Sequence, residues 1–335
     1  MGLGMGLGMG LGMGMGTRTR PNSVHEDARA HRAGVVNGQG EIRTPDTGYP
    51  AYSISNAAPS TARTPVQVGV GADSVAGAMP AAKPAKAPTK TTDPSTTDAL
   101  VLISRRLARA TARLTFTPLV AHVYAPLAYA REPHERYLAL AKAPIDALFV
   151  GMNPGPFGMA QTGVPFGEIA AVRGFLAIDG RVRVPRDTHP KRPVQGFACT
   201  RAEVSGQRFW GLFSRAFASR DACFDRIFVW NYAPLAFVSA TGANITPDKL
   251  PRAQREALES PCNEALVAMT ELLRPRLVIG VGAFARAAAE RALKTCAHRP
   301  EFAQILHPSP ASPAANRGWE PQVRADLVKL RVIAK

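Results

Sequence analysis

The chain contains 335 residues, of which 41 are Lys or Arg and 25 are Asp or Glu, giving a formal net charge of +16 at pH 7. No apolar run approaches the ~20 residues of a membrane-spanning helix, so a helical membrane protein is excluded and a soluble protein is expected. Residues 1–98 carry 9 Lys/Arg and 7 Asp/Glu, which leaves +14 for residues 99–335. A basic folded region indicates a polyanionic partner, most simply a nucleic acid, although basic composition can also serve solubility alone.

The N-terminal region is predicted to be a disordered, low-complexity extension that covers residues 1–96. Residues 1–16 repeat Met, Gly and Leu, and the following sequence is rich in Ala, Pro, Thr, Ser and Gly without sustained periodicity. Residues 41–60 resemble a conceptual translation across a transfer-RNA gene. An over-extended gene model, with the true start at Met79, is therefore a hypothesis, and native N-terminal peptides upstream of Met79 would contradict it.

The folded domain is predicted to span residues 97–335 and to begin with a helix from Thr97 to residue 115, which has apolar residues at helical spacing. The apolar run at residues 145–150 is too short for a helix and is predicted to be a buried strand. The loop that follows, residues 151–168, contains five Gly and three Pro. In open α/β sheets ligands bind outside the carboxyl ends of the strands, where this loop would lie.

The rest of the domain alternates strands and helices. Asp179 to Pro193 is a basic insert and a candidate for phosphate contacts, or a solvated loop. Further strands are predicted at residues 227–230, 277–281 and 305–306, and helices after Gly206, over 251–274 with an interruption at Pro261, over 283–294 and from Trp319 onward. This order predicts an α/β fold with a parallel sheet and helices on both faces.

A glycine motif and the spacing of the four cysteines are both weak evidence for a functional site. Gly280 to Ala285 fit GxGxxA between a strand and a helix, but a lone match is weak, and close packing of the helix on the strand explains the glycines better. The four cysteines, at positions 199, 223, 262 and 296, form no CxxC motif and indicate neither a zinc site nor an iron–sulfur cluster. Scattered thiols are typical of a reducing compartment and of structural roles.

Three polar residues follow three different predicted strands: Asn153, Asn231 and His307. Because the carboxyl ends of parallel strands meet at one edge of a sheet, we expect these side chains to share a pocket. With Phe166 and a glycine-lined backbone nearby, they describe a flat pocket with amide and imidazole hydrogen-bonding groups. Such a pocket suits a nucleobase.

Three stretches carry a specific resemblance. Residues 151–168 (GMNPGPFGMAQTGVPFGE), the SGxxFWG motif at residues 205–211 and HPSPASPAANRGW at residues 307–319 resemble the single-strand-selective monofunctional uracil-DNA glycosylase family. The resemblance covers roughly residues 100–330. It implies the uracil-DNA glycosylase fold, a central four-stranded parallel sheet flanked by helices. It also implies cleavage of the N-glycosidic bond of uracil and some 5-substituted uracils in DNA, without a metal or cofactor, leaving an abasic site.

The resemblance also implies how the base is held. Asn231 matches the residue whose amide pairs with uracil O4 and N3–H and discriminates against cytosine, whose edge is reversed. Phe166 matches the stacking aromatic residue, and Met152 and the Gly155 backbone would line the floor. Gly155 stands where the broader superfamily can carry a bulky residue that excludes a 5-methyl group, so an open glycine there predicts acceptance of 5-hydroxymethyluracil.

For the bond-breaking step, His307 matches the residue that hydrogen-bonds uracil O2 and stabilises the departing anion. Asn153 matches the residue that positions the attacking water. An amide cannot take a proton near neutral pH, so turnover is expected to be slower than in a related enzyme with Asp at this position. No Lys lies within these motifs, so Schiff-base chemistry and strand cleavage are not implied.

Contacts with DNA are expected from two stretches. One stretch, residues 308–313, matches the wedge that enters the duplex and begins with Pro308, Ser309, Pro310 and Ala311. Ala311 stands where an inserting Arg is usual in the family. This difference puts invasion of the duplex and retention of the abasic product in doubt. Arg317 can add charge but does not match the wedge position. Ser205, Gly206 and Ser309 are candidates for contacts with backbone phosphates.

The sequence-based hypothesis is therefore a monomeric base-excision repair glycosylase that acts on single- and double-stranded DNA inside the cell, in a bacterial cytoplasm or a eukaryotic nucleus. One alternative is a superfamily member that prefers another deaminated or oxidised base, such as hypoxanthine or xanthine. A second is a catalytically weak protein that binds uracil or abasic sites. A lesion panel and a binding assay with uncleaved product discriminate among them.

Overall fold

A computed structural model describes residues 94–335 of the chain. The expectations for the N-terminal extension up to residue 93, including the alternative start at Met79, lie outside the described residues. The first helix, α1 (Pro94–Thr111), begins three residues before Thr97, the predicted N-cap. Proline is well suited to the first turn of a helix, because the amide hydrogen that it lacks has no partner there.

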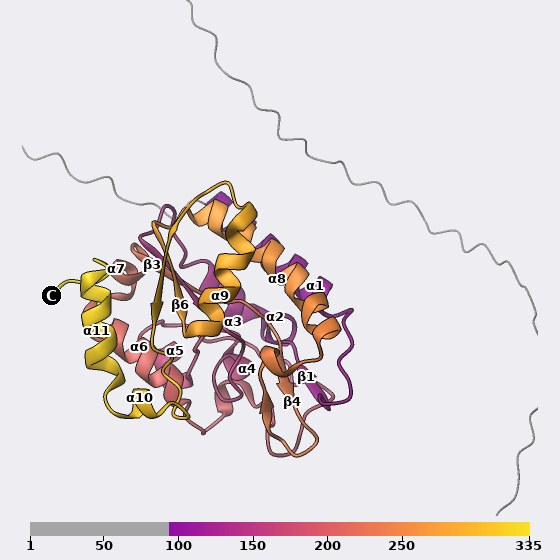
Figure 1. The fold of residues 1–335 in the computed structure, drawn as a ribbon. Coiled ribbons are helices and arrows are strands. Elements are labelled where there is room, and N and C mark those ends of the chain that lie inside the picture. Colours follow the sequence, from indigo (N-terminus) through magenta and orange to yellow (C-terminus); the bar gives the residue numbers. More distant parts are fainter. Residues whose placement is uncertain (1–93) are drawn as a thin grey trace, which may run out of the picture. The chain divides into compact units, whose positions relative to one another are not determined.

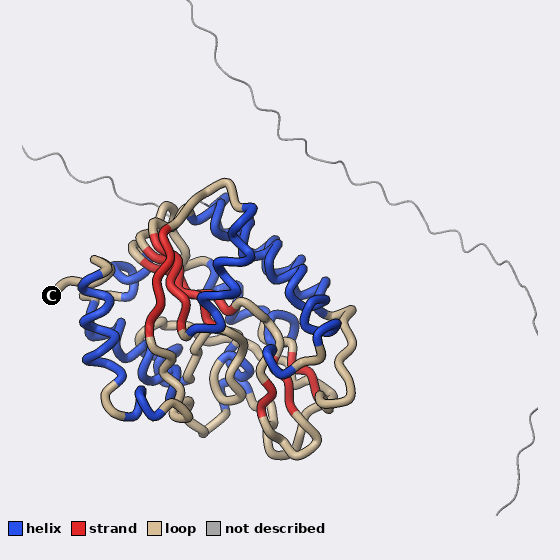
Figure 2. Tube along the Cα trace, in the orientation of Figure 1, coloured by secondary structure: helices blue, strands red, loops and turns tan. Residues whose placement is uncertain are grey.

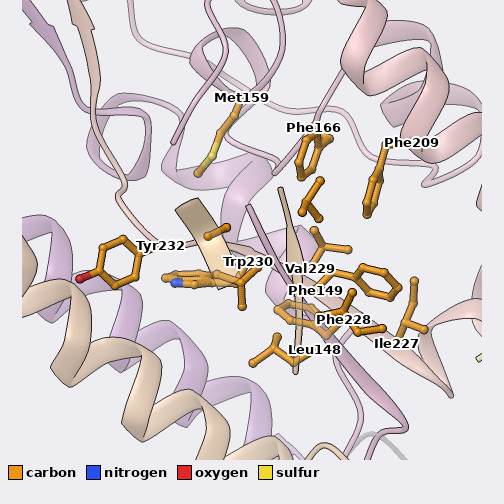
Figure 3. Close-up of a cluster of buried hydrophobic side chains, with 14 of the residues drawn as sticks. Leu148, Phe149, Met159, Phe166, Phe209, Ile227, Phe228, Val229, Trp230 and Tyr232 are labelled. Carbon is orange, nitrogen blue, oxygen red and sulfur yellow. The ribbon is translucent and has the colours of Figure 1, made fainter. Parts of the chain in front are cut away.

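Four parallel strands form the central sheet in the order β3–β2–β6–β7. They are β2 (Ala147–Gly151), β3 (Ile227–Asn231), β6 (Leu277–Val281) and β7 (Glu301–Ile305). Every residue of β2, β3 and β6 is buried, which explains why these strands are continuous apolar runs. The predicted four-stranded parallel sheet is confirmed. Figure 3 shows the dense packing around β2 and β3, with Leu148, Phe149, Phe228 and Trp230 in its centre.

Helices cover both faces of this sheet, as predicted (Figures 1 and 2). On one side lie α1, α8 and α9, and on the other α5, α6, α7 and α11 (Figure 1). Their bounds are α5 (Ile169–Gly174), α6 (Val204–Ala216), α7 (Arg220–Phe224), α8 (Arg252–Leu273), α9 (Ala283–Ala292) and α11 (Trp319–Lys329). Shorter helices are α2 (Pro126–Tyr129), α3 (Arg131–Leu138), α4 (Met159–Thr162) and α10 (Pro313–Asn316). Three single 3₁₀ turns lie at Gly196–Ala198, Pro247–Lys249 and Leu293–Thr295.

A second, antiparallel sheet was not predicted. It consists of β1 (His122–Tyr124), β4 (Ala236–Val238) and β5 (Asn244–Ile245), strands of two or three residues that are too short to show an alternating pattern. The basic insert at residues 179–193 is anchored on this sheet, because the Tyr124 hydroxyl donates to the Arg192 carbonyl at 2.7 Å and accepts from the His189 amide at 2.8 Å.

Several predicted boundaries were wrong. The first helix ends at Thr111 rather than at residue 115, and the fourth strand begins at Glu301 rather than Ile305. That strand lies at the sheet edge and is largely accessible to solvent, so it has no apolar run. The helix over residues 251–274 continues through Pro261. An interior proline costs ~3 kcal/mol, but buried α8 residues on both sides of Pro261 hold the helix against its neighbours.

The GxGxxA interpretation agrees with the packing. A Cβ atom at Gly280 would overlap the backbone of Arg286, so this glycine permits α9 to pack closely on β6. All four cysteines are buried and free. Among residues 94–335, no helix combines the length and apolar character that crossing a membrane requires.

A buried histidine connects three parts of the fold. His134, on α3, lies 2.8 Å through Nδ1 from the Gly163 carbonyl and 2.9 Å through Nε2 from the Ser104 hydroxyl on α1. A carbonyl only accepts, so Nδ1 carries the proton and Nε2 accepts from Ser104. Gly163 follows α4 with φ of 74°. His134 thereby fixes the loop of residues 151–168, and burial lowers its pKa to about 4.

We predict that His134 makes the folded state acid-sensitive. Between pH 6.5 and 4 the unfolded chain binds a proton that the folded chain does not, so stability falls as pH falls, by up to about 3 kcal/mol. Urea denaturation of the wild type and of His134→Gln at pH 7 and pH 4 measures the effect. The variant should be less stable at pH 7 but lose about 3 kcal/mol less on acidification. An identical loss in both proteins would contradict the prediction.

Candidate active site

A cavity of about 350 Å³ lies at the carboxyl ends of the parallel strands. Asn153 reaches it two residues after β2, Asn231 from the last position of β3 and His307 two residues after β7. Six other residues from the predicted site line the same cavity: Met152, Gly155, Phe166, Ser205, Ser309 and Pro310. The structure therefore brings together residues that are up to 158 positions apart in the sequence.

Four residues from the predicted site lie outside the cavity lining. Gly206 and Pro308 are buried, and Ala311 and Arg317 are exposed to solvent. A Cβ atom at Gly206 would overlap the Phe166 carbonyl oxygen, so this glycine permits close packing of α6 against the loop before α5. A phosphate contact by Gly206 stays a prediction.

The Phe166 ring forms a flat side of the cavity and is held in a fixed orientation. Its φ of 51° lies in the left-handed region, which is costly for a residue with a side chain. Packing compensates: the ring stacks on Phe209 of α6, with centroids 4.5 Å apart and an interplanar angle of 12° (Figure 3). Trp210 Nε1 donates to the carbonyl of the preceding residue, Pro165, at 3.0 Å. Two neighbouring aromatic residues of one helix thus set both the ring and its backbone.

The Asn231 amide lies against the end of β2. Asn231 pairs in register with Gly151, and a Cβ atom at Gly151 would overlap Asn231 Oδ1 and lie 3.0 Å from the Phe166 ring. Asn231 is 4% exposed, and its Nδ2 donates to the Met159 sulfur at 3.1 Å. A thioether is a weak acceptor, so a ligand carbonyl can replace it without loss.

His307 presents a defined donor. The Ser309 amide donates to His307 Nδ1 at 3.1 Å, so the proton of the neutral ring is on Nε2. Burial lowers the pKa of His307, which favours the neutral ring. Its ring centroid is 6.1 Å from that of Phe166. The cavity therefore combines a flat aromatic wall with a neutral imidazole N–H.

Asn153 has an unused hydrogen-bonding group. Its Nδ2 atom is buried and has no partner among the described residues. An unpaired buried donor is costly, so a bound water or substrate atom at this position would remove a penalty of about 1–3 kcal/mol.

The predicted wedge loop, residues 308–313, is held in place by Arg208, which was not predicted as a site residue. Arg208 on α6 donates to the Pro308 carbonyl at 3.0 Å and to Asn316 Oδ1 at 2.9 Å. Asn316 Nδ2 donates to the Pro310 carbonyl at 2.7 Å. The loop is thus held between α6 and α10, with the exposed Ala311 within it.

Sequence reasoning also missed Glu203, at the N-cap position of α6. Glu203 lines the cavity, and its Oε2 atom is buried without a hydrogen-bond partner. Burial, with a smaller contribution from the Glu168 carboxylate, raises the pKa of Glu203 to about 7. Cβ atoms at Gly155 and at Gly158 would each overlap the Glu203 carboxyl group. A carboxyl group therefore fills the space that a side chain at position 155 would take, and acceptance of 5-hydroxymethyluracil stays a prediction.

Cationic groups lie at the cavity rim. The Arg201 guanidinium lies 4.0 Å from the ring centroid of Phe157, which lines the cavity, and that of Arg192 lies 5.1 Å from it. Arg192 comes from the basic insert at residues 179–193, and Arg201 lies just before α6. Positive charge at the rim of the cavity attracts an anionic ligand.

Comparisons with known proteins identify the family. The model of the uracil DNA glycosylase superfamily matches residues 140–327. The single-strand selective monofunctional uracil DNA glycosylase of Bos taurus is 47% identical over 222 residues, which is 66% of this chain and 82% of the bovine protein. The rat and mouse proteins of that name are each 46% identical over 229 residues, 68% of this chain and 82% of theirs.

Among solved structures, that of wild-type SMUG2 from Pedobacter heparinus matches with a TM-score of 0.49 and 15% identity, over 68% of this chain and 97% of that chain. The chain belongs to the uracil-DNA glycosylase superfamily and, within it, to the single-strand selective monofunctional uracil-DNA glycosylases.

Proposed function

We propose that the protein removes uracil from DNA in base-excision repair, as a monofunctional glycosylase that hydrolyses the N-glycosidic bond and leaves an abasic site. As a member of this family it is a DNA glycosylase. The observation that carries the proposal is the meeting of Asn153, Asn231, His307 and Phe166 in one cavity of about 350 Å³. That volume suits a small planar ligand such as one base taken out of the nucleic-acid stack.

Recognition of uracil rests on Phe166 and Asn231. The base stacks on the Phe166 ring, whose orientation is fixed by Phe209. The Asn231 amide accepts from N3–H and donates to O4, replacing its contact with Met159. Cytosine reverses this pattern at both positions, so it leaves two buried groups facing groups of the same kind.

Bond breaking uses the neutral groups of the cavity. The bond between C1′ and N1 breaks, and its electron pair passes to the uracil ring. His307 Nε2–H donates to O2, where the negative charge develops. Asn153 orients a water molecule whose oxygen bonds to C1′, and the proton that this water loses passes to the departing base or to solvent.

Contacts with the DNA strand come from the cavity rim. Ser205, Gly206 and Ser309 contact backbone phosphates, and Arg192 and Arg201 supply positive charge. The loop of residues 308–313 enters beside the extruded nucleotide. The protein acts on single- and double-stranded DNA as a monomer, and its substrates include 5-substituted uracils such as 5-hydroxymethyluracil.

The first test is uracil release from a single-stranded oligonucleotide, with alkali treatment to reveal abasic sites. We expect Asn153→Ala and His307→Ala each to lower the single-turnover rate by about 10²- to 10³-fold, the usual cost of losing one such group. His122→Ala, a histidine on β1 outside the cavity, should retain the wild-type rate. An inactive wild type would refute uracil as the substrate and favour another deaminated base, such as hypoxanthine. Full activity in both cavity variants would refute the assigned roles.

A second test concerns Ala311. A longer cationic side chain can fill the space left by the extruded base and contact phosphate, whereas alanine cannot. We therefore expect Ala311→Arg to tighten binding to duplex abasic product by about tenfold, the lower range of a stacking contact, and to slow duplex turnover in proportion. Single-strand turnover should change little. Ala110→Arg, on the exposed face of α1, adds the same charge elsewhere and is the control. Equal effects of the two substitutions would show that charge alone is responsible.

A further inference from the structure

We propose that the basic insert, residues 179–193, and a hollow that it borders beside α3 bind the sugar–phosphate backbone of the DNA strand, on one side of the nucleotide whose base enters the cavity. The inference rests on the proposed function in taking this strand to be the substrate. Binding to the surface itself requires neither uracil nor bond breaking, so it can be tested apart from them.

The hollow is a second cavity, of about 580 Å³, between α3 and the start of the basic insert. It shares no lining residue with the cavity at the carboxyl ends of the strands. Four arginines and two glutamates contribute to its lining: Arg131, Arg136, Arg181, Arg183, Glu132 and Glu135. This excess of positive charge takes no part in the bond-breaking step described above and indicates a separate contact with an anion.

The two carboxylates of the hollow already have protein partners. Glu135 accepts two hydrogen bonds from the Arg105 guanidinium, at 2.8 and 2.9 Å. Glu132 accepts from Arg136 at 2.6 Å and from the backbone amide of Arg181 at 3.2 Å. Neither glutamate is therefore available to neutralise the guanidinium groups that the insert brings to the hollow.

Arg181 and Arg183 supply the unneutralised charge. Both are exposed to solvent, and their guanidinium groups have no hydrogen-bond or ion-pair partner among residues 94–335. Their backbone is nevertheless held in place, because the Arg181 amide donates to Glu132 and the Arg183 amide donates to the Tyr129 carbonyl at 2.9 Å. Two free cations on a fixed backbone suit contacts with phosphates.

The basic insert leads from this hollow to the rim of the substrate cavity. Beyond Arg183 it carries the exposed residues Arg186 and Lys191. It reaches the rim at Arg192, whose guanidinium lies 5.1 Å from the ring centroid of Phe157. Arg192 follows Arg183 by nine positions, so the two lie at most about 32 Å apart. A strand whose base enters the cavity can therefore continue along the insert into the hollow.

The composition of the insert favours a polyanion that is bound through its backbone. It has five basic and two acidic residues. Both acidic residues lie against other side chains: Asp187 Oδ1 is 2.6 Å from His122 Nδ1, and Asp179 accepts from Arg173 at 2.9 Å. The insert contains no Phe, Tyr or Trp on which a base could stack. Binding is therefore expected to be independent of sequence and sensitive to salt.

The test measures binding of uracil-free single strands of about 16 and about 3 nucleotides, which cover about 55 and about 10 Å at 3.4 Å per nucleotide. Fluorescence anisotropy at several salt concentrations gives the affinities. We expect Arg181→Gln combined with Arg183→Gln to weaken binding of the long strand at least about fivefold at low salt. The slope of log affinity against log salt should fall by about 1.4, since each single-strand phosphate contact contributes about 0.7.

The length of the strand tests whether the path is continuous. A short strand occupies either the rim or the hollow but does not link them, so loss of the hollow should weaken its binding by less than about twofold. The long strand gains from both ends at once and should lose more. An equal loss for both lengths would refute a continuous path and would indicate a local anion site.

Two further double variants are matched controls. Arg181→Lys combined with Arg183→Lys keeps both charges and should keep the wild-type slope. Lys294→Gln combined with Lys329→Gln removes two exposed cations outside both cavities and should also keep it. Thermal unfolding midpoints show whether each variant is folded. If the glutamine pair at 181 and 183 fails to fold, Arg183→Gln alone decides, with an expected change in slope of about 0.7.

The outcomes separate this inference from the proposed function. A wild-type slope in the folded glutamine pair would overturn the inference. An equal fall in slope in the Lys294 and Lys329 variant would also overturn it, since net charge alone would then be responsible. Because the strands contain no uracil, a wild type that fails to release uracil would refute the proposed function, while the slopes would still decide whether the insert binds DNA.

Discussion

The site depends on close packing at the carboxyl end of β2, where a side-chain amide, an aromatic ring and a glycine backbone are in contact. The Asn231 amide and the Phe166 ring both approach the backbone of Gly151, and any Cβ atom there would overlap the amide oxygen. Parallel pairing of β2 with β3 places Gly151 opposite Asn231, so the sheet register itself sets the amide in the cavity. The positions of the Phe166 ring and the Asn231 amide therefore follow from strand pairing and from the absence of a side chain at Gly151, rather than from a flexible loop.

Helix α6 connects the other parts of the site. Through Phe209 and Trp210 it fixes the Phe166 wall, through Arg208 it braces the loop of residues 308–313, and its N-terminal end carries Glu203 and Ser205. The position of the Phe166 ring, the position of the loop of residues 308–313 and the position of the Glu203 carboxyl group therefore all depend on α6. A displacement of α6 should affect all three together, whereas changes in the wedge loop alone should leave the wall unchanged.

Sequence predicted the fold well where burial gives a clear pattern. The apolar runs of β2, β3 and β6 are buried along their whole length, and residues at the end of β3 and just after β2 and β7 line one cavity. Prediction failed where tertiary contacts decide: the edge strand β7, the short strands of the second sheet and the helix through Pro261. Glu203 was missed because nothing in its local sequence shows that two glycines nearly fifty residues earlier make room for a buried carboxyl group.

The cavity groups are close to neutral, although the domain around them is strongly basic. Two amides, an imidazole whose pKa burial lowers and a carboxyl group with a pKa of about 7 carry little fixed charge. Such a lining suits a substrate base that enters uncharged. In the proposed reaction, negative charge appears on the base only as the bond breaks, so a neutral donor stabilises the transition state more than the bound substrate. Permanent positive charge lies at the rim, on Arg192 and Arg201, and in the proposed complex it faces the phosphates, which are charged throughout the reaction.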